Sequence, residues 1–141
     1  MQELRGFSLP AAVALLLAGG WQGACAQQPN IVGTWEWTRK SSVCSEQYTY
    51  RDDGTLRIRR GEELTENTYL MSWAPEPSGR YRLTIVTVKD DRGRDCEGST
   101  ADSSGQQSIV YVLSGQSRET MIQCGSPAGA DCTGIMQRTA R

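Results

Sequence analysis

The sequence contains no histidine among its 141 residues. This absence excludes the Ser-His-Asp and Cys-His arrangements of nucleophilic catalysis, and it excludes zinc sites that use imidazole ligands. Carboxylate pairs are present, but none has a spacing that indicates acid–base chemistry. We therefore expect a protein that is not an enzyme and that has no cofactor and no bound metal.

A large charge excess is also absent. The 15 basic and 16 acidic side chains give a formal net charge of −1. Because a nucleic-acid partner requires a clear basic excess, we expect none. The apolar runs are shorter than the roughly 20 residues that cross a membrane as a helix, so we expect no transmembrane segment in the mature chain.

The first 26 residues have the pattern of a secretory signal peptide. Arg5 supplies a short basic region, 9–20 form an apolar region, and Ala24-Cys25-Ala26 offers a small-x-small cleavage site. We expect cleavage after Ala26 and one domain at 27–141, located in the periplasm or outside the cell. Lipoprotein processing at Cys25 is the alternative, but the preceding residues lack the usual leucine.

Four cysteines remain after this cleavage, namely Cys44, Cys96, Cys124 and Cys132. An even number in an exported chain indicates two disulfides, for which three connectivities exist. A zinc site made of all four cysteines is the alternative. The ligands are too widely spaced for it, and an exported compartment does not suit it.

Polar and apolar residues alternate with a period of two along the mature chain, and no long stretch shows the helical period. Eight strands are predicted at 31–38, 44–51, 55–60, 67–74, 80–89, 107–113, 117–124 and 133–139. This pattern predicts an all-β chain folded as an eight-stranded antiparallel up-and-down barrel. Eight strands close around side chains or one small ligand.

The connections between these strands alternate in length. Tight turns are expected at 52–54, 75–79 and 114–116, and longer polar connections at 39–43, 61–66, 90–106 and 125–131. In a meander, successive connections lie at opposite ends, so the long ones define a mouth. All four cysteines fall at this end. We favour Cys124–Cys132, which closes the last hairpin, and by elimination Cys44–Cys96 across the mouth.

Alternation also assigns an inward face to the strands. The inward sets are Trp35 and Trp37; Glu46, Tyr48 and Tyr50; Leu56 and Ile58; Tyr69, Met71 and Trp73; Tyr81, Leu83 and Ile85; and Ile109, Tyr111 and Leu113. Every aromatic residue of the mature chain then points inward. Because these are all Tyr and Trp, the barrel interior is expected to carry polar tips.

With these features the chain resembles the lipocalin-like branch of the calycin β-barrels. The match consists of Gly33-Thr34-Trp35 at the start of the first strand, the eight-strand meander and the long-loop mouth. The resemblance implies that Trp35 packs at the closed end beneath an arginine of the last strand. Arg138 matches this arginine, with Arg141 as the second choice.

Several inward residues are candidates for binding a small, partly apolar or amphipathic ligand at the mouth. They are Trp37, Glu46, Tyr48, Tyr69, Met71 and Tyr111. The opposing interpretation is that these side chains fill a narrow core, as in a structural envelope protein with no ligand. A third is a protein-binding module, such as an inhibitor of secreted proteases, which would use 27–30 and the loop at 90–106. The carboxylates of 90–98 lack the spacing of a calcium loop.

Overall fold

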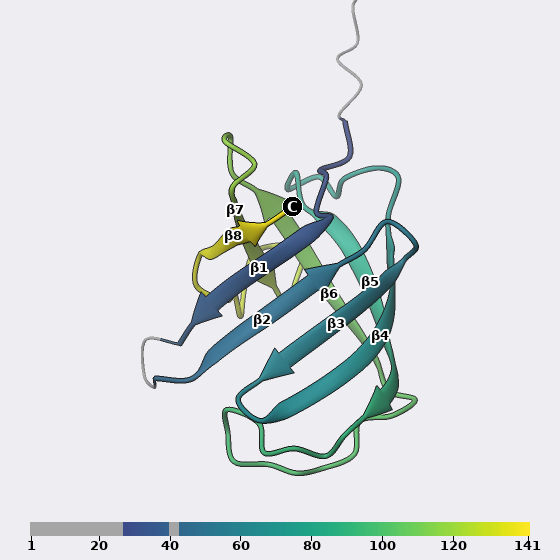
Figure 1. Cartoon of the computed structure of the whole chain (residues 1–141). Helices are drawn as coiled ribbons and strands as arrows, with labels where there is room; N and C mark the ends of the chain where they lie inside the picture. The colour runs from purple at the N-terminus through teal and green to yellow at the C-terminus, as the bar shows by residue number, and fades with distance from the viewer. Residues whose placement is uncertain (1–26, 40–42) are drawn as a thin grey trace, which may run out of the picture.

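The computed structural model describes residues 27–39 and 43–141. They form eight antiparallel strands that pair in chain order and close into a barrel through β1 and β8 (Figure 1). The strands are β1 (Gly33–Thr38), β2 (Ser45–Tyr50), β3 (Thr55–Arg60), β4 (Glu63–Met71), β5 (Tyr81–Asp90), β6 (Gln107–Ser114), β7 (Thr120–Cys124) and β8 (Met136–Ala140). The predicted fold class is confirmed. The expected leader, with Cys25 and the cleavage position after Ala26, lies outside the described residues.

The two predicted disulfides are also confirmed. Cys44 is bonded to Cys96, at a sequence separation of 52, and Cys124 to Cys132, at a sequence separation of 8. Both bonds join segments of the mouth end of the barrel. Two disulfides are typical of chains that fold in an oxidising environment.

The β2–β3 hairpin shows how local sequence produces this fold. In β3, Leu56 and Ile58 are buried, while Arg57 and Arg59, which alternate with them, are exposed. In the preceding turn, the Arg51 N–H donates to the Thr55 carbonyl at 2.9 Å. Gly54 completes the turn with a φ of +81°, a backbone conformation that suits glycine.

The prediction of a long connection at 61–66 was wrong. Strand β4 begins at Glu63, and Arg60 is paired with Glu63, so only Gly61 and Glu62 form the turn. Inward and outward residues do alternate along β4, but the first inward residues are polar. Thr65 and Asn67 are buried and hydrogen-bonded to each other at 2.9 Å. The mouth end therefore carries one tight turn and three longer connections, 39–44, 91–106 and 125–135.

The prediction for the inward face of β6 was also wrong. Val110 packs against the core and Val112 is fully buried, whereas Ile109 and Leu113 are exposed and Tyr111 is on their outward face. Apolar residues occupy both faces of this strand, so alternation alone does not orient it. Pairing with β5 does. Val110 and Val112 lie opposite the buried Leu83 and Tyr81, and directly paired residues share a face.

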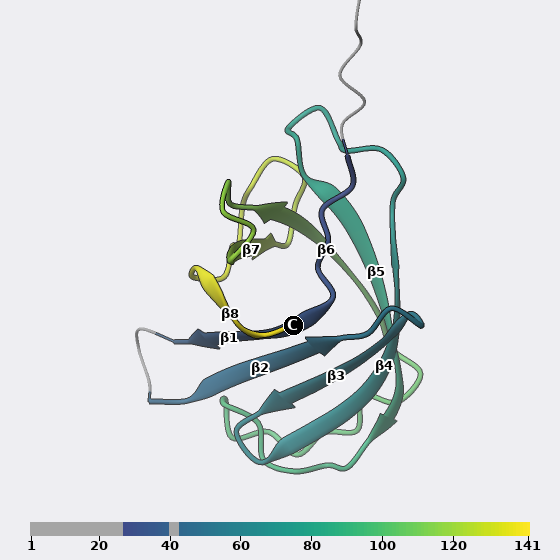
Figure 2. The same cartoon turned by 45° about the horizontal axis from the view of Figure 1, so that its top comes forward.

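Trp73 is a further exception to the prediction that every aromatic points inward. Strand β4 ends at Met71, and the Trp73 side chain in the following turn is 90% exposed. Figure 2 shows this turn beside the N-terminal segment 27–32, at the end of the barrel opposite the 91–106 loop. The Gln28 side-chain amide donates to the Ser72 carbonyl at 2.8 Å and holds the two segments together.

The closed end of the barrel is plugged by Trp35, which is fully buried. Its indole N–H donates to the Ile31 carbonyl at 2.8 Å, and the Arg138 guanidinium lies 4.2 Å from the ring centroid. Gly33 is required beside this pair. It has a φ of +126°, and a Cβ there would lie 2.5 Å from the Ala140 carbonyl oxygen.

Candidate functional site

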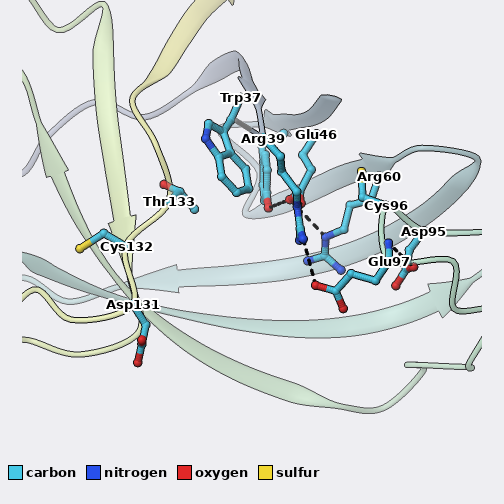
Figure 3. Close-up of a pocket in the computed structure, with 11 residues that line it drawn as sticks. Trp37, Arg39, Glu46, Arg60, Asp95, Cys96, Glu97, Asp131, Cys132 and Thr133 are labelled. Carbon is cyan, nitrogen blue, oxygen red and sulfur yellow. Dashed lines mark hydrogen bonds and ion pairs between the residues drawn. The ribbon is translucent and has the colours of Figure 1, made fainter. Parts of the chain in front are cut away.

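The mouth contains a cavity of about 390 Å³ (Figure 3). Strand β1 contributes Trp37, and Arg39 follows directly after its last residue. Strands β2 and β3 contribute Glu46, Tyr48 and Arg60, and the loop after β5 contributes Glu97. The space is large enough for a small organic molecule.

Glu46 is the central polar group of this cavity and is only 3% exposed. One carboxylate oxygen accepts a hydrogen bond from the Arg39 Nε at 3.1 Å. The other accepts one from the Tyr48 hydroxyl at 2.6 Å and lies 3.6 Å from the Arg60 Nε. These hydrogen bonds and ion pairs compensate for the removal of the carboxylate from water.

Burial raises the pKa of the Tyr48 hydroxyl, and the adjacent Glu46 carboxylate adds to the rise. The hydroxyl therefore remains protonated and acts as a donor to Glu46 at neutral pH. Behind it, Arg60 also lies 3.6 Å from the carboxylate of Glu63, which is 6% exposed. Burial raises the pKa of Glu63 despite this neighbouring positive charge.

Arg39 occupies the outer part of the cavity. Its guanidinium lies 5.5 Å from the ring centroid of Trp37 and makes ion pairs with Glu46 and Glu97, each at 3.0 Å. The hydrogen bonds that Arg39 donates to Glu97 and Glu46 raise its pKa. A positive charge is therefore held between one indole ring and two carboxylates.

A second cavity of about 210 Å³ lies deeper in the barrel and shares Tyr48, Arg60, Asp131 and Thr133 with the first. Its walls combine aliphatic side chains, such as Ile58 and Ile85, with Thr65, Asn67 and Gln123. The Gln123 amide donates to the Tyr50 hydroxyl at 2.7 Å. The barrel interior thus contains open space with both apolar walls and hydrogen-bonding groups.

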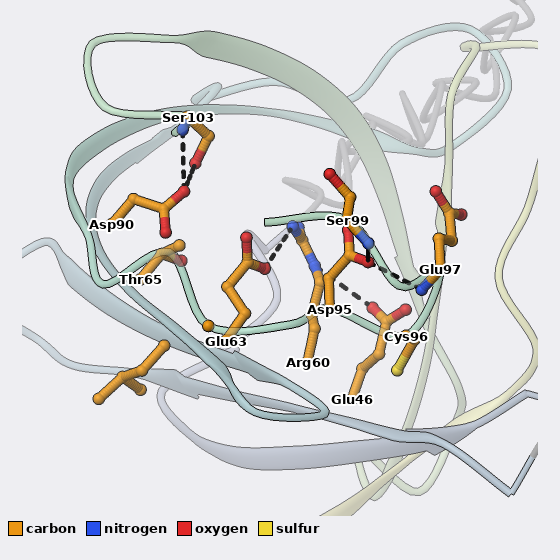
Figure 4. A network of polar contacts seen from close by, with 12 residues as sticks. Glu46, Arg60, Glu63, Thr65, Asp90, Asp95, Cys96, Glu97, Ser99 and Ser103 are labelled. Atoms are coloured by element: carbon orange, nitrogen blue, oxygen red, sulfur yellow. Dashed lines mark hydrogen bonds and ion pairs between the residues drawn. The ribbon is translucent and has the colours of Figure 1, made fainter. Parts of the chain in front are cut away.

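The loop at 91–106 is held across the mouth by its own polar contacts (Figure 4). Asp90 accepts hydrogen bonds from the Ser103 hydroxyl at 2.6 Å and the Ser103 N–H at 2.8 Å. Asp95 accepts from the backbone N–H groups of Glu97 and Ser99. Burial disfavours the charge of Asp90, but its hydrogen bonds outweigh this effect and lower its pKa.

These contacts explain the carboxylates that the sequence concentrates at 90–98, since several of them cap loop N–H groups. Among residues 27–39 and 43–141, no group of three or more Cys, Asp or Glu side chains is placed to hold a metal ion. In the same residues, no helix has the length and apolar character required to cross a bilayer.

The structure brings together only part of the predicted site. Trp37, Glu46 and Tyr48 line the mouth cavity. Tyr69 and Met71 instead line a groove of about 460 Å³ at the closed end, beside the N-terminal segment, and the Tyr69 hydroxyl donates to the Arg51 carbonyl. Tyr111 is on the outer face of β6, so its assignment to an inward ligand site was wrong.

The segment 27–30 and the 91–106 loop, which form the surface expected for a protein-binding module, are not brought together either. The first lies against the end of β4 at the closed end, and the second lies at the mouth (Figure 1). A partner contacting both would have to span the length of the barrel.

Sequence reasoning missed three charged residues of the mouth, namely Arg39, Arg60 and Glu97. Extending the period-2 alternation one step beyond Trp37 and Ile58 points to Arg39 and Arg60. No comparable signal marks Glu97, because a loop side chain has no period and only the fold places it on Arg39.

The mouth therefore contains a small, largely polar cavity with one aromatic wall. No family model, no curated protein and no solved structure matches this chain.

Proposed function

We propose that this chain is an exported, lipocalin-like barrel that binds a small amphipathic molecule in the cavity at its mouth. The observation that carries the proposal is the cavity itself, which is lined by the Trp37 ring, the buried Glu46–Tyr48 pair and Arg60. Ligand sites of this size usually combine apolar walls with a few fixed polar groups that orient the ligand.

The second cavity supports the same proposal. It continues from the first past Tyr48 and Arg60 to the aliphatic side chains of Ile58 and Ile85. A molecule with one apolar part and one polar part can place the first against these side chains and the second at Glu46 and Tyr48. Export of the chain is supported by its two disulfides, which are characteristic of proteins outside the cytosol.

Tryptophan fluorescence tests this proposal. The purified chain is titrated with 2-phenylethanol, phenethylammonium, 3-phenylpropionate and octanoate. We expect at least one compound to change the emission in a saturable way, because the indole of Trp37 lines the cavity.

Two variants locate the signal. Trp37→Phe should abolish the change, whereas Trp73→Phe should retain it, because Trp73 lies at the other end of the barrel. The absence of a saturable change with every compound, together with no heat of binding by calorimetry, would exclude this function.

A further inference from the structure

The Arg39 guanidinium occupies the mouth cavity in the way that a bound organic cation would. It lies over the Trp37 ring at 5.5 Å and bonds to two carboxylates, Glu46 and Glu97 (Figure 3). The negative face of an indole and paired carboxylates are the groups that recognise ammonium and guanidinium ions. The chain thus supplies a cation to its own site.

The charges around the cavity favour a cation over an anion. The acidic and basic side chains that line it are Arg39, Arg60, Glu46, Asp95, Glu97 and Asp131. Carboxylates therefore outnumber guanidinium groups by four to two. If Arg39 moves away, Arg60 is the one remaining cation of this lining. A positively charged ligand then replaces the lost charge, whereas a negatively charged ligand would increase the excess of negative charge.

Arg39 is bound by contacts that can be exchanged. Its side chain is 28% exposed, and the side chain of Glu97 is 68% exposed. Arg138 at the closed end differs from Arg39 in its exposure and in the type of its partners. It is 7% exposed and donates to the backbone carbonyls of Val32 and Asn30, which cannot turn away. The Arg39–Glu97 ion pair joins solvent-accessible side chains and contributes little stability. The buried Glu46 keeps its contacts with Tyr48 and Arg60 when Arg39 leaves, so it is not left without a partner.

We propose that the mouth cavity selects a small organic cation, an ammonium or guanidinium attached to a flat apolar group, which displaces Arg39 from Trp37, Glu46 and Glu97. This inference rests on the proposed function and adds the charge class of the ligand. The apolar group would extend past Tyr48 toward the second cavity, whose aliphatic walls include Ile58 and Ile85.

Three probes with similar skeletons and different charges test this inference by calorimetry, namely phenethylammonium, 2-phenylethanol and 3-phenylpropionate. The wild-type chain should bind them in this order of decreasing affinity. Arg39→Ala should bind phenethylammonium about tenfold more tightly, because the internal competitor is gone. Arg59→Ala is the matched control. It removes the same charge from an exposed position on β3 and should leave the affinity unchanged.

In the Arg39→Ala chain, where Glu97 has no internal partner, Glu97→Gln should weaken the binding of phenethylammonium and leave that of 2-phenylethanol unchanged. Thermal melts establish that each variant is folded, and Arg39→Gln, which has a side chain of intermediate length, replaces Arg39→Ala if the latter does not fold.

The outcomes separate the two proposals. If 3-phenylpropionate binds most tightly and Arg39→Ala loses it, Arg39 is a ligand-binding group for anions and the inference is wrong, while the proposed function stands. Equal affinity for all three probes would also show that the inference is wrong and leave the proposed function standing. If neither the wild-type chain nor Arg39→Ala binds any probe, the proposed function itself fails.

Discussion

The barrel contains two pairs of tryptophan and arginine, one toward each end of β1. The pairs differ in the burial of the ring, in the distance between ring and guanidinium, and in the groups that hold the arginine. At the closed end, Trp35 is fully buried and Arg138 lies 4.2 Å from its ring centroid, held by backbone carbonyls. At the mouth, Trp37 is partly buried and Arg39 lies 5.5 Å away, held by carboxylate side chains.

The difference follows from the partners of each guanidinium. The carbonyls of Asn30 and Val32 belong to the backbone segment that leads directly into β1, so the closed-end pair is part of the framework. The carboxylate of Glu97 sits on a loop and faces solvent, so the mouth pair can separate without opening the barrel. The same two residue types therefore form a structural plug at one end and, as we propose, an exchangeable site at the other.

The largest expected effect comes from removing the two indoles separately. Trp35→Ala should lower the free energy of unfolding by about 3–5 kcal/mol, because it leaves a cavity in the closed end and removes the ring beneath Arg138. Trp37→Ala should cost about 1 kcal/mol or less, since its ring borders an existing cavity. Urea unfolding followed by circular dichroism measures both. Equal losses would show that the two ends do not differ in this way.

The second prediction concerns how the mouth is stabilised. The Cys44→Ser/Cys96→Ser variant should lose up to about 4 kcal/mol of unfolding free energy, and Cys124→Ser/Cys132→Ser about 2.5 kcal/mol, because the first bond closes the longer loop. Reduced and oxidised wild-type chains provide the control. A larger loss from the shorter loop would contradict a chain-entropy origin.

The third prediction compares the two arginines directly. Arg138→Met should cost about 2 kcal/mol, because it leaves the backbone carbonyls of Val32 and Asn30 without this donor and removes the cation above the Trp35 ring. Arg39→Met should cost only about 1 kcal/mol, because its ion pair with Glu97 is exposed and the buried Glu46 keeps Tyr48 and Arg60 as partners. Denaturant midpoints measured at one pH test this. The comparison fails if Arg39→Met is the more damaging change.

The smallest expected effect is a response of the mouth loop to acid. Hydrogen bonds from Ser104, together with Arg92, lower the pKa of Asp102 to about 2. A carboxyl with a depressed pKa stabilises the folded loop above its ordinary pKa, and this contribution disappears as the pH falls from about 4 through about 2. The Ser104 amide resonance should therefore shift with a midpoint near pH 2, and Asp102→Asn should remove the transition. A midpoint near 4 would show that these contacts are absent.

The sequence predicted the barrel well where alternation is amphipathic, and poorly where it is not. The limits of β3 at 55 and 60 were predicted correctly, because Leu56 and Ile58 alternate with two arginines. The start of β4 was missed because its inward residues, such as Thr65, are polar. The face of β6 was misassigned because both faces are apolar, and only pairing with Leu83 and Tyr81 orients it.

The candidate site was predicted in part for the same reason. Trp37, Glu46 and Tyr48 follow from alternation on β1 and β2, whereas Tyr69 and Met71 share an inward face with the mouth residues but lie toward the opposite end of the barrel. Facing inward is a property of the strand, but depth along the barrel depends on the register between strands.

The sequence by itself determined the class of fold and the number of strands, because these depend on local alternation and turn residues. It also favoured the observed pairing of the cysteines among three connectivities, from the position of each cysteine relative to the turns. Only the tertiary structure decided which charges meet. Arg39 reaches Glu97 across 58 residues of sequence, and Arg138 reaches Val32 across 106. Contacts of this kind form when the sheet closes, so the two ends of β1 acquire different chemistry from residues that no local pattern connects.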